Sequence, residues 1–156
     1  MSVRILRNYP LQYFNSLKPT KYTDIFNSPT CTIGKYKKED GETKARAVLC
    51  VLFNDFFENF NVGQSMSVSQ VAKLVDRILE NYGMLKIDDL KLCFDMVLRG
   101  HFGVVYRLDV NVVVDWMDRY LNERLNEAES ESLNEHINVK ASEKRDVSFL
   151  EILKNR

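Results

Sequence analysis

The chain has 156 residues, 45% of them apolar, and its 22 Lys and Arg balance its 22 Asp and Glu. This length fits one domain with a tail, and the apolar fraction excludes a wholly disordered chain because a core can be buried. Only 6 Gly and 3 Pro argue against an all-β sandwich, which needs many tight turns.

The charge is distributed unevenly along the chain. Residues 1–38 carry seven Lys and Arg against one Asp, residues 39–120 carry nine against thirteen, and residues 121–156 carry six against eight. A mildly acidic body will not bind a phosphate backbone over its whole surface. The basic arm, with aromatics between its charges, is the candidate for weak DNA binding, against the alternative of an ordinary solvated arm. Its basic residues are Arg4, Arg7, Lys18, Lys21, Lys35, Lys37 and Lys38.

Residues 1–41 are expected to form an irregular arm, because prolines and glycines interrupt it and leave room only for short helices around "LQYFNSL" and "TDIFN". Residues 42–61 predict the buried central helix, with apolar side chains at helical spacing from Ala45 to Phe60 and a stop at Val62-Gly63.

Two further helices are marked by caps at both ends. Ser67 or Ser69 is suited to begin a helix that runs to about Tyr82, and Asp88 to begin the next one. Gly83 and Gly100 directly follow the last periodic apolar residues of these helices, as C′ glycines do.

The stretch "GHFGVVYRLDVNVVVDWMDRY" (residues 100–120) is valine-rich but does not alternate as a strand would. Its first part predicts a loop. Asp109 then fits an N-cap, with Leu108 and Val113 as a hydrophobic staple. We therefore predict an all-α fold, in which residues 42–128 form a compact bundle of about four main helices.

The C-terminal region divides into two parts by composition. Residues 129–146 are rich in Glu, Ser, Asn and Lys and indicate a charged linker or a frayed helix end. Residues 147–156 predict a short amphipathic helix that either packs back on the body or docks on a partner protein. Its apolar residues are Val147, Phe149, Leu150 and Leu153.

Candidate chemistry is sparse. His101 has no Cys or His neighbour to make a ligand pair, and Asp115 and Asp118 lack a matching acidic pair elsewhere. No phosphate-binding, dinucleotide-binding or nucleophile-elbow motif is present in the sequence. We expect no catalytic or metal site, no cofactor and no small-molecule substrate. Three cysteines outside any CxxC spacing, and no signal peptide or membrane-spanning run, lead us to expect a soluble protein of a reducing compartment.

Three segments carry a resemblance to a known family: "SPTCTIGKYKKEDGETKA", "LKIDDLKLCFDMVLRGHFGVVY" and "LDVNVVVDWMDRYLNER". Together they resemble small helical proteins encoded by phages and mobile elements of gut bacteria. The shared loop pattern is Gly-x-Phe/Tyr-Gly-x-x-Tyr, here Gly100, Phe102, Gly103 and Tyr106, followed by Asp109 as the cap. The resemblance implies a helical fold and a phage protein of the bacterial cytoplasm or the virion. It does not imply any particular activity.

In layout, a helical body with a charged tail is similar to phage helicase loaders. We therefore expect a non-enzymatic adaptor in DNA replication that contacts a replicative helicase or an initiator, without membrane contact. The alternatives are a virion or assembly component that contacts virion subunits, and a small regulator that blocks a host protein. Phe102 and Tyr106 are a further candidate partner surface, unless both rings only close the end of the bundle.

Overall fold

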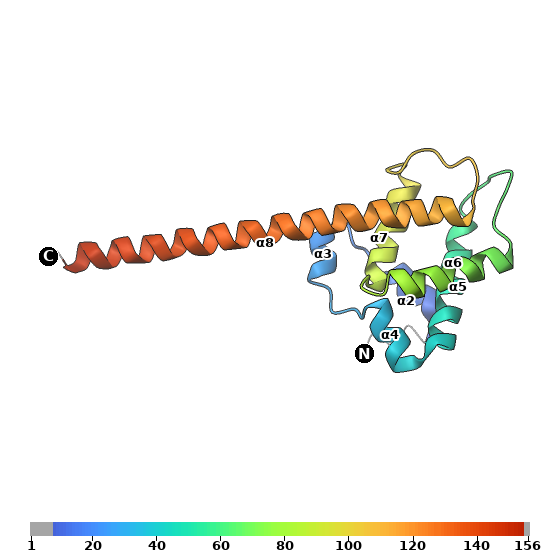
Figure 1. Cartoon of the computed structure of the whole chain (residues 1–156), viewed down its shortest axis with the longest axis horizontal. Coiled ribbons are helices and arrows are strands. Elements are labelled where there is room, and N and C mark those ends of the chain that lie inside the picture. The colour runs from blue at the N-terminus through green and yellow to red at the C-terminus, as the bar shows by residue number, and fades with distance from the viewer. Residues whose placement is uncertain (1–7, 155–156) are drawn as a thin grey trace. The chain divides into compact units, whose positions relative to one another are not determined.

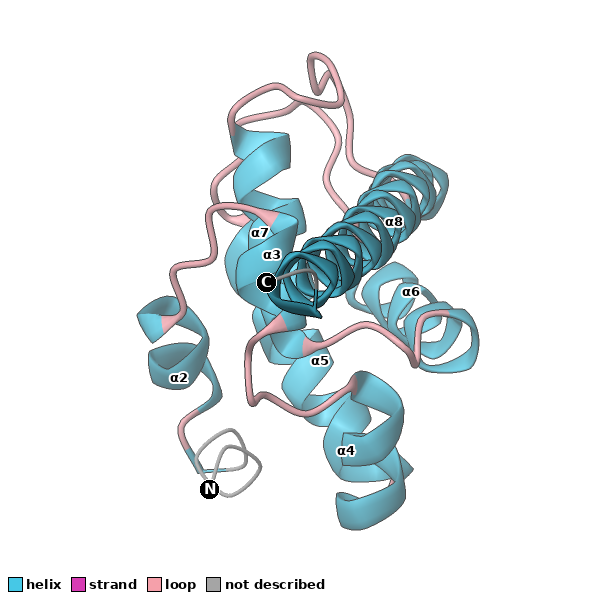
Figure 2. Cartoon of the chain, turned by 90° about the vertical axis from the view of Figure 1, so that its left-hand side faces the viewer, coloured by secondary structure: helices cyan, strands magenta, loops and turns pink. Residues whose placement is uncertain are grey.

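The computed structural model describes residues 8–154, and the side chains of residues 8–144. Within this range every regular element is a helix, so the all-α prediction is confirmed (Figure 1; Figure 2). None of the described helices is both long and apolar enough to cross a membrane. The helices, in chain order, are α2 (Pro10–Ser16), α3 (Tyr22–Phe26), α4 (Ile33–Asp40), α5 (Glu42–Phe57), α6 (Val68–Asn81), α7 (Ile87–Leu98) and α8 (Val110–Lys154).

The N-terminal arm is more ordered than the sequence suggested. The short helices α2 and α3 lie where "LQYFNSL" and "TDIFN" allowed them, but α4 was not expected. Tertiary contacts explain α4: its buried side chains are Ile33 and Tyr36, and its first amides bond to the chain before α7. Gly34 N donates to the Gly83 carbonyl at 2.8 Å, an approach so close that a Cβ on Gly34 would lie 3.1 Å from that oxygen.

Helix α5 is the central element, as its apolar sequence predicted. It is packed against α2, α4 and α6. Its Phe56 ring stacks on Phe94 of α7 at 3.9 Å between centroids, and Phe53 meets Phe94 edge-on at 5.1 Å. Aromatic rings bury large areas in such offset and edge-to-face arrangements, so this cluster dominates the core.

The helix starts follow the expected chemistry at two positions and differ at a third. Ser67 caps α6 in a reciprocal capping box with Gln70, and Asp109 Oδ1 accepts from Val112 N at 3.0 Å at the start of α8. The prediction that Asp88 caps α7 is wrong. The N-cap residue is Lys86, whose amide donates to Asp89 Oδ2 at 2.7 Å. Asp88 is therefore left for another role.

Helix α8 begins on the body of the protein. Its inner face carries the buried residues Val113, Met117 and Tyr120, and Trp116 packs near Phe60 with ring centroids 6.2 Å apart. The helix then runs without a break through residues 129–146, which were expected to be a linker or a frayed end, to Lys154. The contacts between residues fall into two groups, so that the chain divides into two units, residues 1–120 and residues 121–156.

Candidate functional site

The loop between α7 and α8 is built on two left-handed glycines. Gly100 has φ 79° and Gly103 has φ 100°, a region of backbone space that L-residues with a side chain rarely adopt. Gly100 N donates to the Val97 carbonyl at 3.0 Å, just after the last residue of α7. The loop returns to the body where Leu108, itself buried, donates its amide to the Gln64 carbonyl at 3.0 Å.

The two aromatic residues of this loop have different environments. Phe102 is 8% exposed, and the guanidinium of Arg119 lies 5.1 Å from its ring centroid. Arg119 Nη1 also donates to the Phe102 carbonyl at 3.1 Å, which attaches the loop to α8. Tyr106 is 82% exposed. Of the proposed pair, Phe102 therefore closes the bundle and only Tyr106 offers its ring to a partner.

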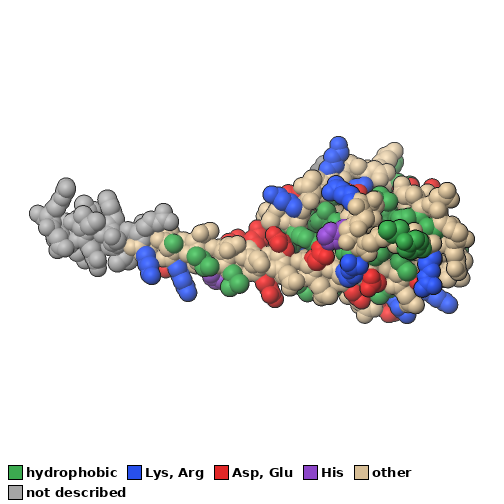
Figure 3. Space-filling model, turned by 90° about the horizontal axis from the view of Figure 1, so that it is seen from above, with side chains coloured by type: hydrophobic (Ala, Val, Ile, Leu, Met, Phe, Trp, Pro, Cys, Tyr) green, Lys and Arg blue, Asp and Glu red, His purple; other side chains and the backbone are tan. Residues whose placement is uncertain are grey.

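The predicted docking residues Val147, Phe149, Leu150 and Leu153 fall within α8, but their side chains lie outside the described residues. The same helix has a second set of apolar residues that the sequence analysis did not single out. Figure 3 shows hydrophobic side chains on the surface of the segment that follows Tyr120. They are Leu125, Leu133, Ile137 and Val139, which are 47%, 63%, 63% and 54% exposed.

The basic side chains of the arm are partly neutralised. Lys35 Nζ lies 3.7 Å from Glu39 Oε1, and Lys37 Nζ lies 3.1 Å from Glu42 Oε2. Lys18, Lys21 and Lys38 are exposed, whereas Arg4 and Arg7 lie outside the described residues. The charge available for a phosphate backbone is thus smaller than the sequence count indicates.

Two of the acidic residues noted in the sequence take structural roles. Asp118 accepts a hydrogen bond from the Tyr82 hydroxyl, and Asp115 faces Arg119 at 3.8 Å. The described residues contain no group of three or more His, Cys, Asp or Glu that could hold a metal ion. None of the three cysteines forms a disulfide within the described residues, and burial raises the pKa of the Cys31 thiol, so that Cys31 is a poor nucleophile.

Three small cavities adjoin one another along one face of α7. Asp88, Lys91, Asp95 and Arg99 follow one another at spacings of three or four residues and therefore share that face. The opposite wall of the first two cavities is the segment from α2 to α3, which they share, and the third cavity lies between α2, α7 and the C-terminal end of α5. The cavities have volumes of about 230, 300 and 170 Å³.

The first of these cavities contains a feature that the sequence analysis missed. Asp88 is 4% exposed, and only its Oδ2 has a partner among the described residues, the Thr30 hydroxyl at 2.9 Å. Two adjacent aspartates stand at the start of α7, and the sequence pattern assigned only a cap, to Asp88. Because Asp89 alone is sufficient for the cap, the second aspartate is the signal that pointed to a further role.

Comparisons with protein-family models, with curated proteins and with solved structures found no match.

Proposed function

We propose that this protein is a non-enzymatic adaptor of a phage or mobile element that acts in DNA replication through protein–protein contacts. The observation that carries the proposal is the set of exposed apolar side chains on α8 after Tyr120. Leu133 and Ile137 are each 63% exposed and one helical turn apart, so they present a shared apolar face. Burying a side chain of this size contributes roughly 1.5–3 kcal/mol, which favours a partner that covers both.

The charge of the segment after Tyr120 indicates which kind of partner surface would complement it. Between residues 121 and 135 the chain carries Glu123, Glu127, Glu129, Glu131 and Glu135 against the single base Arg124. A partner surface that places basic side chains around an apolar groove would complement this segment and associate faster at low ionic strength. The layout similarity to helicase loaders makes the replicative helicase or an initiator of the host the first partner to test.

The test is capture of the purified replicative helicase, or the initiator, by the immobilised full chain. We expect the wild type to retain it and the double variant Leu133→Glu/Ile137→Glu to lose at least about tenfold in affinity, because two buried apolar contacts are replaced by charges. Val68→Glu is the matched control, since Val68 is 85% exposed on α6 and lies in the other unit of the chain. Deleting residues 146–156 tests the docking residues of the C-terminal end.

Equal capture by the double variant and the wild type would exclude the α8 face as the docking surface. Absence of capture together with a stoichiometric amount of the protein in purified particles would instead support a virion component. Contact of the arm with DNA is a separate part of the proposal. It predicts retention on DNA that weakens steeply with salt and disappears when residues 1–38 are removed.

A further inference from the structure

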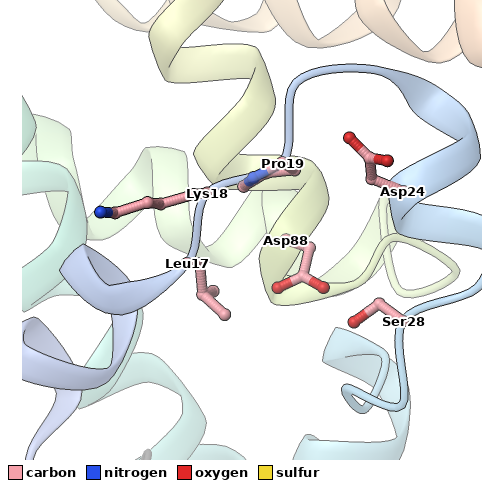
Figure 4. A pocket seen from close by; sticks show the side chains of 6 residues that line it. All are labelled: Leu17, Lys18, Pro19, Asp24, Ser28 and Asp88. Atoms are coloured by element: carbon pink, nitrogen blue, oxygen red, sulfur yellow. The ribbon is translucent and has the colours of Figure 1, made fainter.

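The cavity between the α2–α3 connection and the start of α7 has a volume of about 230 Å³. Figure 4 shows the carboxylate of Asp88 directed toward the space between Leu17 and Ser28. The remaining lining residues are Lys18, Pro19 and Asp24. Leu17 and Pro19 thus form an apolar wall beside a carboxylate.

Asp88 is the unusual member of this set. Its Oδ1 atom is buried and has no hydrogen-bond partner among the described residues. A buried acceptor without a donor destabilises the folded state by roughly 1–3 kcal/mol, and more when the acceptor is charged. A ligand that donates a hydrogen bond to this oxygen should therefore gain more binding free energy than one that donates to an exposed carboxylate.

The basic side chains nearby do not fill this role. Lys86 Nζ donates to the carbonyls of Ile25 and Ser28 at 2.9 and 2.7 Å, so its hydrogens hold the loop after α3 against α7. Lys18 is exposed, and Figure 4 shows its side chain pointing away from Asp88. The chain therefore provides the carboxylate but uses its neighbouring cations elsewhere.

A metal ion fits the site poorly. Asp24 Oδ2 already accepts from Thr20 N and Thr20 Oγ1, both at 2.9 Å, and these bonds are the main reason that the pKa of Asp24 is lowered. Asp88 Oδ2 accepts from Thr30. Hard divalent cations need six or more oxygen ligands, and the described residues hold no cluster of three candidate ligand side chains.

We propose that this cavity binds an ammonium or guanidinium group carried on an aliphatic stem, with the cation donating to Asp88 Oδ1 and the stem packing on Leu17 and Pro19. This combination of a carboxylate and an apolar wall suits the amphipathic side chains of lysine and arginine. The group belongs either to a partner protein or to a free small amine. The inference rests on the cavity alone and does not require the proposed adaptor function.

The test is titration of the ¹⁵N-labelled full chain with methylguanidinium chloride, n-butylammonium chloride and a capped Gly-Arg-Gly peptide, followed by amide NMR. Sodium chloride at equal ionic strength and a capped Gly-citrulline-Gly peptide are the controls. We expect saturable shifts of the amides of Ser28, Thr30 and Asp88 with the organic cations only. A response to the free amines but not to the peptide would assign the site to small amines, and a response to both would admit a partner side chain.

Substitutions test whether the amide shifts depend on the carboxylate of Asp88. Asp88→Asn keeps an oxygen that can accept from Thr30 but removes the charge, and we expect binding at least about tenfold weaker. Asp95→Asn is the matched control on the same helix, where Asp95 faces Lys91 at 3.9 Å, and it should bind as the wild type does. Leu17→Trp fills the cavity while it retains both carboxylates, so it should also weaken binding, and it replaces Asp88→Asn if that variant fails to fold.

Three outcomes would overturn the proposal. The first is the absence of a saturable shift with every cation, which would leave the cavity to water. The second is an equal response of Asp88→Asn and the wild type. The third is a stronger response of the same amides to Mg²⁺ or Ca²⁺ than to the organic cations.

Discussion

The Tyr120 hydroxyl donates to Asp89 Oδ1 at 2.7 Å, and both residues are fully buried. The other oxygen of the same carboxylate accepts from Lys86 N at the start of α7. One side chain thus caps one helix and bonds to another, which fixes α7 against the first turns of α8. Both carboxylate oxygens of Asp89 accept a hydrogen bond, whereas only one oxygen of its neighbour Asp88 does.

Removing the hydroxyl of Tyr120 should destabilise the body. Tyr120→Phe leaves Asp89 Oδ1 buried with one donor fewer, and we expect a loss of about 1–3 kcal/mol in the free energy of unfolding, measured by urea denaturation. Tyr106→Phe is the control, because Tyr106 is 82% exposed, and it should change this free energy by less than about 0.5 kcal/mol. Equal stability of the two variants would contradict a structural role for the Tyr120–Asp89 bond.

The buried tyrosines should make the fold sensitive to alkali. Burial raises the pKa of Tyr120 and of Tyr82, and the carboxylates of Asp89 and Asp118 raise them further. Below the unfolded value of about 10, both states keep their protons and the stabilisation is complete. Above it the unfolded chain ionises while the folded chain does not, so the free energy of unfolding falls as the pH rises.

Tyrosinate absorbance measures this effect directly. We expect Tyr82 and Tyr120 to be among the tyrosines that ionise only when the chain unfolds, at the same pH at which the helical circular dichroism is lost. In the double variant Tyr82→Phe/Tyr120→Phe the late, cooperative part of the absorbance change should become smaller, because two of the protected hydroxyls are removed. A wild-type titration that is complete near pH 10, with the helices intact, would show that these hydroxyls are not protected.

The end of α7 depends on a glycine. Gly100 has φ 79°, so Gly100→Ala forces a left-handed conformation on a residue with a Cβ and should cost roughly 1–2 kcal/mol in thermal or urea unfolding. Gly63→Ala is matched to it, since Gly63 has no positive φ and a Cβ there would meet nothing within 4 Å. That variant should be neutral or slightly stabilising. A Gly100→Ala protein as stable as Gly63→Ala would show that the loop adjusts without strain.

The aromatic cluster predicts the largest single loss of stability. Phe94 is 4% exposed and contacts the rings of Phe14, Phe53 and Phe56, so Phe94→Ala should cost about 3–5 kcal/mol. Val68→Ala, at a residue that is 85% exposed, provides the comparison and should change stability by less than about 0.5 kcal/mol. A loss below 1 kcal/mol for Phe94→Ala would mean that this cluster is not the centre of the core.

Arg119 should control the order of the loop between α7 and α8. Arg119→Ala removes both the bond to the Phe102 carbonyl and the contact with its ring, so amide hydrogen exchange of residues 101–107 should accelerate while that of α5 is unchanged. Asp115→Ala removes only the weak 3.8 Å ion pair with Arg119 and should leave the loop amides as they are. Similar acceleration in both variants would assign the effect to α8 instead of the loop contact.

The sequence by itself determined the features that depend on neighbours along the chain. The apolar period of α5, the Ser67 and Asp109 caps, the end of α7 at Gly100 and the all-α class were all predicted, because each follows from local backbone geometry or from one helical face. The tertiary structure added contacts that the local pattern of α4 does not contain, since its first two amides, those of Ile33 and Gly34, donate to the carbonyls of Leu85 and Gly83, which are distant in sequence. It also decided the different roles of Asp88 and Asp89: partners from α8, the arm and the α7 start surround them, and no local pattern specifies which oxygen is left without a donor.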